Sequence, residues 1–126
     1  MKKLAEIQGE LAKQTARSAW GRGVLVYASD LLEDIAERAE YEGKEPETFA
    51  ELKDYALNGA KDWTQYSYGG SALIYDYDSA RQLCTPSELK KTRDGERRPN
   101  SREEWLDVQA RALNQAFNKL WSIARA

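Results

Sequence analysis

The fold is decided by residues 24–41, which read VLVYASDLLEDIAERAEY. Apolar residues recur there every three or four positions, a spacing that places them on one face of a helix. The members of this wide stripe are Val24, Leu25, Tyr27, Leu31, Leu32 and Ile35. The acids opposite them are Asp30, Glu33, Asp34 and Glu37. The pattern predicts a helix that follows a break at residues 20–23, runs to about Tyr41 and must bury its apolar face.

A second long apolar stripe lies near the end of the chain. Ser101 and Glu104 have the spacing of a capping box, which predicts a helix start at that point. The stripe that follows consists of Trp105, Val108, Ala112, Ala116, Leu120 and Ile123. A chain of 126 residues has to bury its two longest stripes against something. We therefore expect the terminal helix to pack on the helix of residues 24–35.

Shorter signals predict further helices. Apolar spacing over residues 4–11 indicates a short first helix, and a capping box at Thr48 begins another that ends at Asn58. Residues 85–88 (TPSE) have the composition of one more helix start. The chain is therefore predicted to be all-α or nearly all-α. We expect one compact helical domain over residues 1–126, with about five helices and a short irregular aromatic segment.

That aromatic segment covers residues 63–78, WTQYSYGGSALIYDYD, and holds four of the seven tyrosines around a Gly-Gly pair. Aromatic residues at this density are typical of recognition surfaces, because Tyr and Trp combine a large contact area with a polar group. They are equally typical of a core where helices converge. Both interpretations remain open. The candidate partner-binding residues are Trp63, Tyr66, Tyr68 and Tyr75, with Tyr77 beside them.

Charge is separated along the chain, although the formal net charge is only −2. Residues 30–54 hold ten acids and three bases, a net charge of −7. Residues 90–102 hold six bases and two acids, a net charge of +4. The acidic candidates for steering a partner are Glu33, Asp34 and Glu37. The candidates for contacting nucleic acid are Lys90, Lys91, Arg93, Arg97, Arg98 and Arg102, on a turn-rich loop that is equally typical of a solvated surface.

Composition excludes several classes of site. The chain has no histidine and one cysteine, Cys84, so Ser-His and Cys-His dyads, disulfides within the chain and cysteine-built zinc sites are all excluded. Asp62, Asp76 and Asp78 lack the spacing of a calcium loop, and helix capping or salt bridging is the favoured role for them. Residues 69–70 lack the Lys-Ser/Thr of a phosphate loop. We therefore predict no catalytic residue, no metal and no cofactor.

The first residues, MKKLAEIQGELAKQ, carry charges every few positions, unlike the apolar region of a signal peptide. No window has the length and hydropathy of a membrane span. These features, with the single cysteine, predict a cytoplasmic protein without membrane contact.

Three motifs carry a resemblance to known sequences: WTQYSYGGSALIYD at 63–76, LCTPSELKKT at 83–92 and PNSREEWLDVQARAL at 99–113. The chain resembles a group of small uncharacterised accessory proteins of bacterial mobile elements and prophages, from about Ala19 to the end of the final helix. The resemblance implies a context. Compact accessory proteins of such elements are often host-defence inhibitors, including anti-CRISPR proteins, or regulators.

We therefore expect a non-enzymatic binding protein that occupies a host protein or nucleoprotein complex, with CRISPR-type defence complexes as the leading class. The acidic helices would face a nucleic-acid-binding channel, while the aromatic segment supplies apolar anchors. The alternative is a nucleic-acid-binding accessory or regulatory protein that uses the basic loop and the aromatic segment. A carboxylate-based hydrolase is a distant third.

Overall fold

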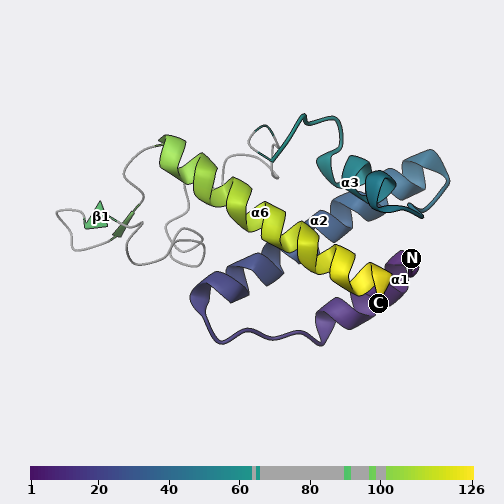
Figure 1. Cartoon of the computed structure of the whole chain (residues 1–126), viewed down its shortest axis with the longest axis horizontal. Helices are drawn as coiled ribbons and strands as arrows, with labels where there is room; N and C mark the ends of the chain where they lie inside the picture. Colours follow the sequence, from purple (N-terminus) through teal and green to yellow (C-terminus); the bar gives the residue numbers. More distant parts are fainter. Residues whose placement is uncertain (64, 66–89, 92–96, 99–101) are drawn as a thin grey trace.

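The computed structural model describes residues 1–63, 65, 90, 91, 97, 98 and 102–126. Its described helices are α1 (Leu4–Ala12), α2 (Ala19–Glu42), α3 (Phe49–Leu57) and α6 (Arg102–Arg125). Its described strands are β1 (Lys90–Lys91) and β2 (Arg97–Arg98), which pair with each other in antiparallel fashion. Apart from this minimal pairing the described chain is all-α, as predicted (Figure 1). It shows four of the roughly five expected helices, and the helix expected after Thr85 lies outside the described residues.

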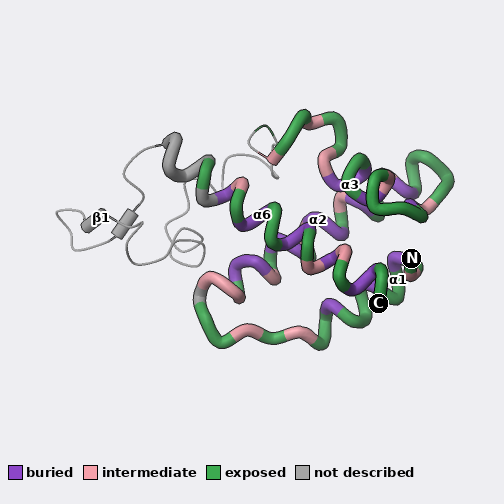
Figure 2. The backbone as a smooth tube through the Cα atoms, in the orientation of Figure 1, coloured by how far each residue is buried: buried purple, intermediate pink, exposed green. Residues whose placement is uncertain are grey.

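Helices α2 and α6 form the centre of the fold. They cross each other in Figure 1 and make the most extensive contact between any two of the described elements. Leu31 and Ile35 of α2 and Leu113 and Leu120 of α6 are completely buried, and Figure 2 shows buried positions gathered where the helices cross. The predicted packing of the terminal helix on residues 24–35 is therefore confirmed. Helices α1 and α3 pack against both long helices and complete the core.

The predicted break at residues 20–23 is wrong, because α2 already begins at Ala19. The Ser18 hydroxyl accepts a hydrogen bond from the Gly21 amide at 2.9 Å and caps the helix. A Cβ added at Gly21 would lie 2.8 Å from the Ala16 Cβ, so glycine permits the chain to approach closely where it enters the helix. Gly21 and Gly23 therefore belong to the first turns of α2.

Several helix ends agree with the sequence. Helix α2 ends at Glu42, one residue beyond the predicted Tyr41, and Gly43 follows in the left-handed conformation with φ +70°. The Thr48 hydroxyl accepts a hydrogen bond from the Glu51 amide at 3.2 Å, as the capping box predicts. Helix α3 ends before Asn58, which has φ +45°.

Two hydrogen bonds hold the first residues of the chain. The Leu4 amide donates to the Glu45 carboxylate at 2.8 Å, so a side chain 41 residues away caps α1. The Lys2 amide donates to the Ala124 carbonyl at 2.8 Å, beside the end of α6. Leu4, Ile7 and Leu11 are buried, which confirms the predicted first helix. None of the helices in the described residues has the length and apolar composition to span a membrane.

Candidate interaction surface

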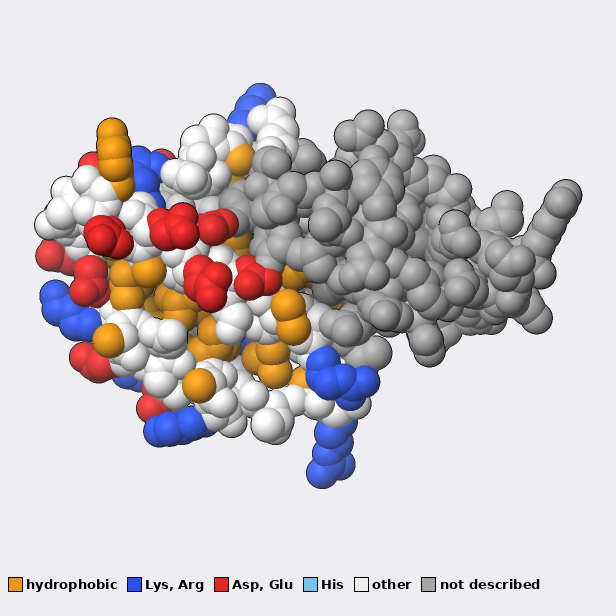
Figure 3. Space-filling model, turned by 180° about the vertical axis from the view of Figure 1, so that it is seen from behind, with side chains coloured by type: hydrophobic (Ala, Val, Ile, Leu, Met, Phe, Trp, Pro, Cys, Tyr) orange, Lys and Arg blue, Asp and Glu red, His pale blue; other side chains and the backbone are white. Residues whose placement is uncertain are grey.

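The outward face of α2 is acidic. Seen from behind, acidic side chains gather beside a patch of hydrophobic side chains (Figure 3). Glu33, Glu37 and Glu40 are exposed, and within the described part of the chain none of the three has a cationic partner. The structure divides the predicted acidic residues between two hollows. Glu33 lines a groove beside α1, whereas Asp34 and Glu37 line a smaller hollow on the other side of the helix.

The groove has a volume of about 880 Å³ and lies between α1, α2 and the loop that follows α2. The buried leucines Leu4, Leu11 and Leu32 contribute its apolar lining. Small residues widen it, namely Ala5, Ala12, Ser29, Ala36, Ala39 and Gly43. Its charged lining residues are Lys3, Glu33, Glu40, Lys44, Glu45 and Glu47. The groove therefore combines an apolar floor with a predominantly acidic rim.

The two lysines of the rim have different surroundings. The Lys44 ammonium lies 3.6 Å from the carboxylate of Glu51 on α3, and these two charges offset each other. Lys3 has no carboxylate partner among the residues that the structure describes. The Glu45 carboxylate is engaged at the first turn of α1. Glu33, Glu40 and Glu47 are the acids of the rim that are exposed to solvent and have no cationic partner among the residues with a described position.

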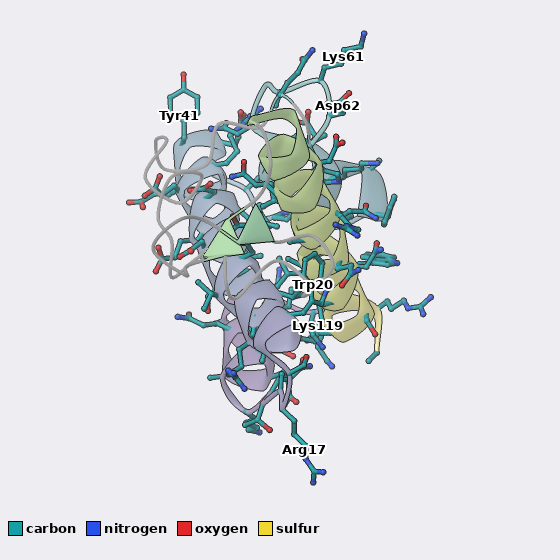
Figure 4. All side chains as sticks on the ribbon, turned by 90° about the vertical axis from the view of Figure 1, so that its left-hand side faces the viewer. Arg17, Trp20, Tyr41, Lys61, Asp62 and Lys119 are labelled. Carbon is teal, nitrogen blue, oxygen red and sulfur yellow. The ribbon has the colours of Figure 1, made fainter. Side chains whose placement is uncertain are left out.

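The smaller hollow, of about 350 Å³, contains a residue that sequence reasoning missed. Tyr41 is 87% exposed and lines this hollow with Asp34 and Glu37. Figure 4 shows its side chain pointing away from the helices. The signal was present, because Tyr41 follows Asp34 by seven residues and Glu37 by four, a spacing that places all three on one helix face. The apolar stripe of α2 lies elsewhere, so an aromatic residue at this position had to be exposed.

Arg38, which also lines the smaller hollow, is engaged by other groups. Its guanidinium lies 2.8 Å from the Glu42 carboxylate and donates to the Asn58 side-chain oxygen at 3.1 Å. It also lies 3.7 Å from an Asp54 carboxylate oxygen and 5.4 Å from the centre of the Tyr55 ring. The hydrogen bond to Glu42 raises the pKa of Arg38 further. Arg38 therefore links α2 to α3 and its charge is shared among several acceptors.

Asp30 reports the electrostatic character of this side of α2. Partial burial raises the pKa of its carboxyl above the usual 3.8, and the charges of Glu33 and Asp34 raise it further. Ionisation of Asp30 is therefore less favourable than that of a fully solvated aspartate. A cation placed nearby would lower that pKa again.

The aromatic residues divide between core and surface. Phe117 is buried, and its ring centre lies 5.5 Å from that of Phe49 and 5.7 Å from that of Trp63. Phe49 also lies 5.1 Å from Trp121. Trp63 is partly buried against the core, so this member of the predicted recognition surface contributes to packing. The other predicted members, Tyr66, Tyr68, Tyr75 and Tyr77, lie outside the described residues.

Trp20 forms a separate link between the two long helices. Its indole nitrogen donates to the Gln115 side-chain oxygen at 2.7 Å, and the Arg111 guanidinium lies 5.2 Å from the ring centre. Figure 4 shows Trp20 beside α6. Partly buried and held by two residues of α6, Trp20 secures the first turn of α2.

The predicted basic residues lie apart from the acidic groove in sequence, and four of them are paired through their backbone. Lys90 lies opposite Arg98, and Lys91 lies opposite Arg97. Arg102 begins α6, whereas Arg93 lies outside the described residues.

Of the predicted capping acids, Asp62 accepts a hydrogen bond from the Gln65 amide at 3.3 Å, which is a capping contact. Asp76, Asp78, Cys84 and residues 69–70 lie outside the described residues. In the part of the chain that the structure covers, no three acidic or cysteine side chains gather in a way that would hold a metal ion. No family model, no curated protein and no solved structure matches the chain.

Proposed function

We propose that this chain is a non-enzymatic binding protein that acts by occupying a macromolecular partner, with the acidic face of α2 as its contact surface. The observation that carries the proposal is the row of exposed carboxylates at Glu33, Glu37 and Glu40 that lack a cation among the described residues. The exposed ring of Tyr41 lies on the same helix beside them. Tyrosine is one of the residue types that most often dominate binding energy at interfaces.

This arrangement is unfavourable for the isolated protein. Glu33 and Glu37 are separated by one helical turn, as are Glu37 and Glu40, and like charges at such spacings destabilise a helix by about 0.2–0.5 kcal/mol per pair. The raised pKa of Asp30 has the same origin in part. A positively charged partner would relieve these repulsions and would be attracted from a distance. We therefore assign the acidic face to recognition of a basic surface.

The partner class that fits best is a host nucleoprotein complex, of the CRISPR type or another defence system. Proteins that bind nucleic acid present clustered Lys and Arg to the phosphate backbone, and a row of carboxylates offers them a competing negative surface. The resemblance to small proteins of mobile elements and prophages adds a context in which blocking such a complex is useful. Inhibition would then require occupancy alone and no catalytic residue.

Affinity capture from the native bacterial host identifies the partner, and a charge-reversal variant tests the surface. The triple change Glu33→Lys, Asp34→Lys and Glu37→Lys should slow association with the captured partner and weaken its salt dependence. The matched control is Glu6→Lys, Glu10→Lys and Asp107→Lys, which changes the net charge equally at exposed positions away from this face. Circular dichroism checks that both variants fold. Equal association rates for the two variants would contradict the assignment.

The paired basic residues support a second candidate function, binding of nucleic acid. The register of β1 and β2 sets Lys90 opposite Arg98 and Lys91 opposite Arg97. These four bases belong to the basic segment 90–102, and Lys and Arg are the residue types that most often contact phosphates. Replacing all four residues with Gln should weaken binding to any DNA or RNA sequence and flatten the dependence of affinity on salt. This candidate fails if nucleic-acid affinity is the same before and after the change.

A further inference from the structure

The groove between α1 and α2 has the form of a binding site for a helix. We infer that it takes a basic amphipathic helix of the partner protein, an inference that rests on the proposed function and names the chemistry of the partner. An apolar groove between two helices is a common receptor for such segments, which insert apolar residues spaced three, four and seven apart. The reasons are the lining, the length and the charge of this groove.

The base of the groove is apolar, and its sides carry small side chains. Leu4, Leu11 and Leu32 line it although each is almost fully buried, so their accessible atoms form a floor. Ala5 and Ala36 are exposed on opposite helices, and side chains this small let a third backbone approach closely. The α1 wall has nine residues, which corresponds to roughly 13 Å of helix. A ligand helix of two to three turns would therefore match its length.

The acidic rim determines the sign of the charge that the ligand helix must carry. Glu33 and Glu40 lie seven residues apart on α2, two helical turns along the same face, and both border the groove. Glu47 adds a third acid to the lining. Because Lys44 is paired with Glu51, Lys3 is the one lining cation without a carboxylate partner in the described part of the molecule. Lys or Arg residues flanking the apolar side of a ligand helix would meet these acids.

The test uses two synthetic helical peptides and isotope-labelled full-length protein. The first peptide carries Leu at positions spaced three and four apart and Lys at all remaining positions. The second peptide replaces each Lys with Glu. Nuclear magnetic resonance should show saturable shifts for the Lys peptide at backbone amides of α1 and α2 that border the groove. The Glu peptide should produce no saturable shifts, because the rim repels it.

Matched variants locate the contact. Glu40→Lys borders the groove and should weaken Lys-peptide binding about tenfold, since a lost attraction and a new repulsion each contribute several-fold. Glu37→Lys makes the same charge change on the same helix outside the groove and should weaken binding less than about threefold. Ala36→Gln should obstruct the groove without changing its charge. Ala50→Gln is its exposed control on α3.

The outcomes separate this inference from the proposed function. Shifts on another face, equal effects of Glu37→Lys and Glu40→Lys, or unchanged binding in Ala36→Gln would overturn the groove assignment. Concentration-dependent shifts of the groove amides without peptide would overturn it in favour of a second copy of this chain. With the captured partner, a loss of binding in the Glu33, Asp34 and Glu37 triple variant but not in Glu40→Lys would retain the acidic face and reject the groove.

Discussion

Replacing Phe117 with Ala should strongly destabilise the protein, because its aromatic ring is buried in the core. Phe117 is 1% exposed, and its ring meets Phe49 at 5.5 Å and Trp63 at 5.7 Å. Truncating a buried Phe costs about 3–5 kcal/mol through lost burial and the cavity left behind. Each ring contact contributes about 0.5–1.5 kcal/mol beyond burial, so we expect the upper part of that range, about 4–5 kcal/mol.

That cost is large compared with the ordinary stability of a small protein, about 5–15 kcal/mol. For a chain of 126 residues, each kcal/mol lowers the melting temperature by about 4 °C, so Phe117→Ala should lower it by about 15–20 °C. Circular dichroism melting and urea unfolding measure the change. The substitution also removes a contact that joins α3 to α6, so loss of α3 protection in hydrogen exchange should accompany it.

Phe49 provides the matched control, because its ring contacts that of Phe117 but is 42% exposed. Phe49→Ala should cost about 1–2 kcal/mol, since solvent already covers much of the ring and little cavity forms. The double variant should show a coupling of about 0.5–1.5 kcal/mol between the two rings. A cost below about 2 kcal/mol for Phe117→Ala, or an equal cost for Phe49→Ala, would refute the packing described.

Three further changes have definite expectations. Asp30→Asn should stabilise the protein near neutral pH, because burial and the neighbouring acids disfavour the charged form of Asp30. The gain in stability should shrink as the pH falls through the raised folded-state pKa toward the ordinary value of 3.8. Melting curves recorded at a series of pH values measure this dependence. Gly43→Ala should cost about 1 kcal/mol in urea unfolding, because φ +70° is strained for alanine although the space for its Cβ is open. Glu45→Ala should cost about 1 kcal/mol by removing the cap at Leu4, and hydrogen exchange should show fraying of α1 while α2 stays protected.

Helix positions were predictable wherever local spacing determined them. The stripe from Val24 to Ile35 and the capping hydroxyl of Thr48 depend on neighbours within a few residues, and the structure confirms both. The predicted start of α2 is wrong because the low helix propensity of Gly21 is offset by a packing benefit. That benefit is the close approach of Ala16, a contact that the residue spacing does not reveal.

The candidate site was less predictable than the helices. The acidity of α2 is evident from its composition. Whether Glu33 or Glu37 lines the groove, however, depends on where α1 lies against α2. One contact that holds α1 there comes from Glu45, which caps this helix from 41 residues further along the chain. No periodicity encodes a contact over that distance. Tyr41 is harder to recognise for a different reason, because it is a single aromatic residue at the end of a helix, whereas residues 63–78 concentrate five aromatic residues.

The hydrogen bond from the Lys2 amide to the Ala124 carbonyl brings the two chain ends into contact. A few Gly and Ser residues would therefore span Met1 to Ala126 and permit a circularly permuted protein. New ends placed after Gly59, which follows α3 at an exposed turn, would leave all four described helices intact. An affinity tag on such a permutant would be attached after α3 and no longer beside α1. Labels at the new ends would then lie beyond α3, apart from the residues that line the groove.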